Sequence, residues 1–100
     1  MYKATMLYRQ PSDPDAFENY YFGTHMTLAA KVPNVARVET ARATPNPDGS
    51  EAPVYRTAEM WFNDLETLQA SLASPDGQAV VADCAVFATG GVDFFVSIVD

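Results

Sequence analysis

Residues 35–62 read VARVETARATPNPDGSEAPVYRTAEMWF, and this stretch decides the fold. Apolar and polar residues alternate between Val35 and Thr44, which predicts a strand, and Val54 to Phe62 is predicted to be the next one. The Pro-Asn-Pro-Asp-Gly-Ser run between them is the strongest turn signal in the chain. Two strands that are joined only by such a loop are expected to form an antiparallel hairpin.

The segments on either side of this hairpin each predict a strand and helical structure. The helix starts carry capping residues, with Pro14 and Pro75 in first turns, where a missing N–H costs nothing. The predicted elements are a strand over Tyr2–Arg9, a helix from Ser12–Asp15 to about Lys31, a helix opening at Asn63-Asp64, a helix from Ser74-Pro75 to Gly90-Gly91, and a last strand over Val92–Val99.

This order predicts one α+β domain over residues 1–100, a ferredoxin-like βαββαβ arrangement. Its sheet would have four antiparallel strands with the helices on one face. Large apolar groups nevertheless point to both faces, since Met60 and Phe62 alternate with Trp61, and Phe94 with Phe95. We therefore expect the uncovered face to pack against a second copy, giving a homodimeric α+β barrel.

The composition excludes several classes of partner. Six basic residues face 13 acidic ones, and a net charge of −7 argues against nucleic acid and anionic membranes. No stretch of about 18 apolar residues predicts a membrane span, and the first residues lack the apolar core of a signal peptide. Because Cys84 is the only cysteine, no internal disulfide can form, and a cytoplasmic protein is expected.

His25 is the only histidine and the first candidate for chemistry, because its ordinary pKa permits proton exchange near neutral pH. At about 100° per residue it falls on the inward face of the predicted helix, flanked by Tyr20. An imidazole beside tyrosine hydroxyls suits proton transfer. The alternative is a core histidine that is bonded to a tyrosine or a carbonyl. The residues on this face are Phe17, Tyr21, Thr24, His25 and Leu28.

The other titratable residues are weaker candidates. Glu59 lies within a predicted strand, where glutamate is uncommon, and would act as acid or base if buried, or else pair with an arginine or with a second subunit. Asp83 is expected on a solvated helix face, and Cys84 as a small buried hydrophobe. No common metal set can be assembled from one histidine and one cysteine, so no metal is expected, although a single His25 ligand to haem stays an alternative.

Several segments resemble the EthD family, named from ethyl tert-butyl ether degradation. The run Phe17-x-x-Tyr20-Tyr21-x-x-x-His25 is similar to the signature of its first helix. Residues 58–66, 74–83 and 87–92 also fit, in the expected order, and the Ser-Pro-x-Gly start with a Gly-Gly stop is the most specific match. The family usually continues His-x-Pro, where Thr27 stands here.

This resemblance implies a dimeric α+β barrel with ferredoxin-like subunits, and we expect no cofactor. The wider superfamily includes muconolactone-type isomerases, polyketide cyclases, cofactor-free monooxygenases and haem enzymes. EthD proteins are associated with degradation operons, often beside cytochrome P450 systems, and some are labelled reductases. Tyr20, Tyr21 and His25 match the family at its first helix and carry over as candidate catalytic residues.

Three functions stay open. The first is a cofactor-free enzyme acting on a small hydrophobic or aromatic compound, with His25 as acid or base. The second is an accessory protein that binds such a compound for an oxidase of the cytochrome P450 type, with His25 as an anchor. The third is a haem-linked role. The predicted substrate-binding residues are Phe17, Leu28, Glu59 and Trp61.

Overall fold

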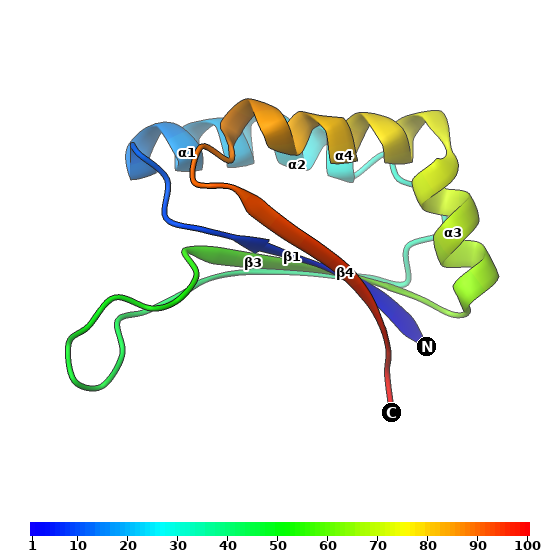
Figure 1. Cartoon of the computed structure of the whole chain (residues 1–100). Helices are drawn as coiled ribbons and strands as arrows, with labels where there is room; N and C mark the ends of the chain where they lie inside the picture. The colour runs from blue at the N-terminus through cyan, green and yellow to red at the C-terminus, as the bar shows by residue number, and fades with distance from the viewer.

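The computed structural model describes residues 1–100 and has one four-stranded sheet in the order β2-β3-β1-β4, with every neighbouring pair antiparallel. The helices lie along one face of the sheet and leave the other bare (Figure 1). This is the ferredoxin-like α+β fold predicted from the sequence. The elements are β1 (Tyr2–Tyr8), α1 (Pro14–Tyr20), the π-helix η1 (Tyr21–His25), α2 (Met26–Ala29), β2 (Arg37–Arg42), β3 (Arg56–Phe62), α3 (Leu65–Ala73), α4 (Pro75–Phe87) and β4 (Val92–Ile98).

The first helical region differs from the single α-helix that the sequence predicts. Its N-cap is Asp13, whose carboxylate accepts a hydrogen bond from the Ala16 N–H at 3.1 Å. After α1 the backbone changes to i→i+5 bonding over η1 before α2 resumes. The wider turn changes which side chains share a face, so Thr24, expected inside, is exposed, whereas Tyr21 and His25 are buried.

The second helical region begins and restarts at the predicted caps. The Asp64 carboxylate accepts from the Thr67 N–H at 2.7 Å, and the Ser74 hydroxyl accepts from the Gly77 N–H at 3.1 Å. The helices α3 and α4 meet so tightly that a Cβ on Gly77 would lie 2.2 Å from the Ser71 carbonyl oxygen. No helix of the protein is both long and apolar enough to cross a membrane.

The core between helices and sheet consists of two clusters. One is aromatic and gathers Tyr8, Phe17, Tyr21 and Phe87, while the other contains Phe62 and its aliphatic neighbours. T-shaped and stacked ring pairs with centroids 5.0–5.6 Å apart join Phe17 to its neighbours. Such pairs add directional attraction to the burial of apolar area, so the aromatic cluster fixes how the first helical region sits on the sheet.

The bare face of the sheet carries ion pairs as well as apolar groups. Lys3 pairs with Glu59 at 2.5 Å, and the cationic groups of Lys3 and Arg37 lie 5.3 Å and 4.8 Å from the centroid of the Trp61 ring. Phe95, which faces the same side, is 46 % exposed. A large apolar group and a half-covered indole therefore stay open to a partner on this face.

Candidate functional site

His25 lies at the end of η1 and is bonded to a carboxylate from another helix. Its Nδ1 lies 2.9 Å from Oδ2 of Asp83 on α4, and the Tyr20 hydroxyl donates to Oδ1 of the same carboxylate at 2.7 Å. The side chains of His25 and Asp83 are only 4 % and 10 % exposed. The expectation that Asp83 sits on a solvated helix face is wrong, because α4 packs against η1 and brings it over His25.

Aromatic rings hold the imidazole in place. The centroid of the Phe87 ring lies 4.5 Å from that of His25, and the centroid of the Tyr21 ring lies 5.4 Å from it. The hydrogen bond to Asp83 raises the pKa of the Tyr20 hydroxyl, since it stabilises the protonated phenol. The Asp83 carboxylate thus links Tyr20 and His25 through one hydrogen bond to each, at a partly desolvated position.

A cavity lies beside His25, between the helices and the sheet. Of its 15 lining residues 14 are apolar, and His25 is the exception. It offers about 80 Å³ of space for water-sized molecules. Three lining residues, Val38, Val81 and Phe94, are 46 %, 49 % and 47 % exposed, so the cavity reaches the surface. Other walls come from Met6, Met60, Val80 and Cys84.

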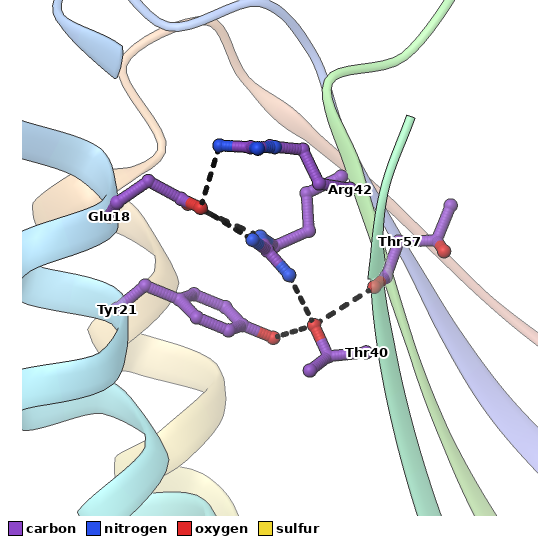
Figure 2. A network of polar contacts seen from close by, with 6 residues as sticks. Glu18, Tyr21, Thr40, Arg42 and Thr57 are labelled. Atoms are coloured by element: carbon purple, nitrogen blue, oxygen red, sulfur yellow. Dashed lines mark hydrogen bonds and ion pairs between the residues drawn. The ribbon is translucent and has the colours of Figure 1, made fainter. Parts of the chain in front are cut away.

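Tyr21 also lines the cavity, but its hydroxyl points into a polar network beneath α1 (Figure 2). The Thr40 hydroxyl lies 2.9 Å from the Tyr21 hydroxyl and donates its own hydrogen to the Thr57 carbonyl at 3.2 Å. Tyr21 must therefore be the donor to Thr40. Burial raises the pKa of Tyr21, so this proton is held firmly.

The same network includes a buried charge. Arg56, 5 % exposed, donates to Thr40 at 3.1 Å and to both carboxylate oxygens of Glu18 at 2.6 Å and 3.3 Å. Figure 2 shows Glu18 on the helix facing the sheet side chains, with Arg42 also turned toward its carboxylate from the sheet. The guanidinium bonds to Glu18 and to Thr40, which is the hydrogen-bond partner of Tyr21. Arg56 therefore helps to hold the Tyr21 hydroxyl in place and does not line the cavity.

The structure brings His25, Tyr20 and Tyr21 together, and places the predicted substrate-binding residues elsewhere. Phe17 is 2 % exposed within the aromatic cluster, and Leu28 packs against the aliphatic one. Glu59 and Trp61 lie on the bare face of the sheet, since strand alternation puts Ala58 and Met60 toward the helices. None of these four lines the cavity.

The sequence reasoning missed Asp83 and most of the cavity wall. The alternation in β3 already pointed Ala58 and Met60 inward, so these two could have been assigned as lining residues. No local signal connects Asp83 to His25, which is 58 positions away. The chain contains no group of three or more histidine, cysteine, aspartate or glutamate side chains that could hold a metal ion.

The strand order, the one-sided helix layer and the cavity between them define a ferredoxin-like α+β protein. The model of the EthD domain matches residues 9–91, so the chain belongs to the EthD family.

Two relatives extend this assignment. An EthD family protein from Bacillus halodurans superposes with a TM-score of 0.93 at 31 % identity, over 100 % of this chain and 99 % of the other. An uncharacterised 11.0 kDa protein of the thcB-thcC intergenic region of Rhodococcus erythropolis is 36 % identical over 92 residues, 92 % of this chain and 88 % of that protein.

A more distant structure shares the fold alone. It is a dimeric ferredoxin-like protein of unknown function from Thermobifida fusca, with a TM-score of 0.70 at 14 % identity over 98 % of this chain and 90 % of the other.

Proposed function

We propose that this chain binds a small, uncharged, mostly apolar molecule in the cavity and exchanges a proton with it at His25. The observation that carries the proposal is the lining, in which 14 of 15 residues are apolar and the one exception is a histidine. Ligand sites combine apolar walls with a few polar groups that orient the ligand. A nearly buried imidazole in such a wall is suited to general acid–base chemistry.

The lining also restricts the ligand's charge and size. It contains no lysine, arginine or carboxylate, so a charged ligand would lose its hydration without gaining a partner. About 80 Å³ accommodates only a few atoms, so a larger ligand would extend through the opening at Val38, Val81 and Phe94. A neutral lactone or phenol with one polar edge fits these limits.

A homodimer is part of the proposal. Phe95 and Trp61 are available on the bare face, and a structural relative is described as dimeric and ferredoxin-like. Two sheets packed through these faces would remove the exposed apolar area from water. We also propose a cytoplasmic location, which suits a chain whose one cysteine, Cys84, is free and buried.

A non-catalytic binding protein, serving an oxidase such as a cytochrome P450, is the second candidate. One observation favours it: the Tyr21 hydroxyl, which could polarise a carbonyl, is already committed to Thr40. The only side-chain group that the cavity then offers to a ligand's polar atom is the free ring nitrogen of His25, and no side-chain hydroxyl is available beside it. In this case His25 would anchor the ligand by a hydrogen bond and transfer nothing.

The two candidates are separated by testing turnover and binding on the same variants. The reactive probe is α-angelica lactone, whose double bond moves into conjugation when a proton leaves the α carbon and another is added at the γ carbon, without any co-reactant. Ultraviolet absorbance follows this isomerisation. Binding is followed independently with toluene, by NMR chemical shifts.

For the enzyme we expect isomerisation above the buffer rate, and a loss of at least about 100-fold in His25→Gln with toluene binding retained. Thr24→Ala, an exposed position in the same π-helix, is the matched control and should change neither quantity. Binding of toluene without isomerisation would instead support the carrier. Failure to bind either probe would refute both.

A further inference from the structure

We propose that Asp83 and Tyr20 fix His25 in a single tautomer. In this tautomer Nδ1 keeps its hydrogen, and Nε2 alone exchanges a proton with a ligand in the cavity. Both would be positioning residues, since they act through His25. This deepens the proposed function and rests on it for its chemical meaning. The two hydrogen bonds to Asp83 that fix the tautomer are present in the free protein.

The hydrogen-bonding capacity of each group fixes where the hydrogens lie. An ionised carboxylate only accepts hydrogen bonds. Since Oδ2 of Asp83 lies 2.9 Å from Nδ1 of His25, the hydrogen must be on Nδ1. Oδ1 accepts from the Tyr20 hydroxyl at 2.7 Å, so both oxygens are used and the carboxylate is held against rotation. In the neutral imidazole Nε2 is then a bare acceptor, and in the imidazolium it carries the mobile proton.

Burial makes this preference strong. The Asp83 side chain is 10 % exposed and that of His25 is 4 % exposed, so water competes little for either group. Charge-assisted hydrogen bonds are among the stronger ones in proteins, and they strengthen further away from water.

Nε2 is the atom that remains for a ligand. It has no hydrogen-bond partner within the chain, although the side chain is almost fully buried and borders the cavity. It is not among the buried side-chain atoms that lack a hydrogen bond, which are Thr5 Oγ1, Ser71 Oγ and Ser97 Oγ. Nε2 therefore stays accessible, and a ligand's polar group can reach it where His25 borders the cavity.

Because His25 is the only histidine, a sample labelled with 15N in histidine gives the nitrogen signals of this ring alone. We expect the neutral form of the parent protein to show a hydrogen-bearing Nδ1 and a bare Nε2. In Asp83→Asn, Tyr20 should go on donating to the amide oxygen. The amide NH₂ then faces Nδ1, and the hydrogen of the ring should move to Nε2.

The double variant Asp83→Asn/Tyr20→Phe removes the donor that orients the amide, so a mixture of the two tautomers is expected. Asp76→Asn, exposed on the same helix, is the matched control and should leave the ring as in the parent. Asparagine nearly matches aspartate in shape, which keeps the test usable if Asp83→Ala does not fold.

A bare Nδ1 in the parent protein, or an unchanged tautomer in Asp83→Asn, would overturn the inference. Neither readout depends on a substrate. If the tautomer inverts as expected while α-angelica lactone is not isomerised by the parent, the positioning of His25 stands and the catalytic proposal fails.

Discussion

Removing Glu18 should destabilise the protein far more than removing any exposed acidic residue. Its carboxylate is the only one that pairs with Arg56, whose side chain is 6 % exposed. Glu18→Ala leaves this guanidinium buried with only Thr40 and two aromatic faces beside it. Breaking a buried ion pair from one side costs roughly 3–5 kcal/mol, because a charge stays in a poor solvent without its partner.

The lower end of that range applies, since the Glu18 side chain is 23 % exposed and water can reach part of the site. About 3 kcal/mol is a large part of the roughly 5–15 kcal/mol by which a small domain is stable. The midpoint of thermal unfolding should fall by about 12–24 °C, since each kcal/mol shifts it by about 4–8 °C in a domain of this size.

Urea unfolding, followed by far-ultraviolet circular dichroism at a fixed protein concentration, measures the change. Glu66→Ala is the matched control, because Glu66 is exposed on α3, away from the bare face of the sheet, and forms no ion pair. An exposed acidic residue of this kind contributes little. The double variant Glu18→Ala/Arg56→Met should recover part of the loss, since no charge remains buried. A loss below about 1 kcal/mol in Glu18→Ala would refute the reasoning.

Three further predictions follow from contacts and ionisation. Gly77→Ala should destabilise the protein by about 1–3 kcal/mol in urea unfolding, because its Cβ would lie 2.2 Å from the Ser71 carbonyl oxygen; stabilisation, as helix propensity alone predicts, would contradict this packing. Burial raises the pKa values of Tyr8 and Tyr21 above 10.0, so the unfolded chain releases these protons first and stability should fall as pH rises above about 10. Tyr8→Phe should reduce this fall in unfolding measured against pH, and an equal slope would argue against the assignment. Light scattering at micromolar concentration should give twice 10.9 kDa, and Phe95→Asp should shift the mass toward one chain; a parent mass of 10.9 kDa would exclude the dimer.

The parts of the fold that could be predicted from the sequence depend on local hydrogen bonds. Asp64 and Ser74 cap helices because their oxygens reach an N–H three residues on, and Pro75 fits a first turn whatever surrounds it. The Gly90-Gly91 pair that follows α4 is explained by its own backbone conformation and by a contact with a distant residue. Gly91 adopts a φ of +97°, and a Cβ on Gly90 would lie 2.1 Å from the Gln10 carbonyl oxygen.

The site could be predicted only in part, because its geometry depends on a register change and on packing between helices. An ideal wheel predicted Tyr21 and His25 on one inward face, but it also put Thr24 there, which the π-helix turns outward. Asp83 becomes a partner of His25 only through the contact of α4 with η1. Sequence spacing contains no information about that contact.

The hydrogen bonds of the lining side chains also limit what chemistry the cavity can support. Three of the lining side chains carry a polar hydrogen, and each donates it away from the cavity: Tyr21 to Thr40, His25 to Asp83, and the Cys84 thiol to the Val80 carbonyl at 3.6 Å. A reaction that needs a separate acid and base has no second side chain to supply one. A proton shift in which a single nitrogen removes a proton and returns it to another atom of the same ligand uses Nε2 as both base and acid. The polar contacts of this site therefore favour a one-base proton shift over reactions that need a second side chain as acid or base.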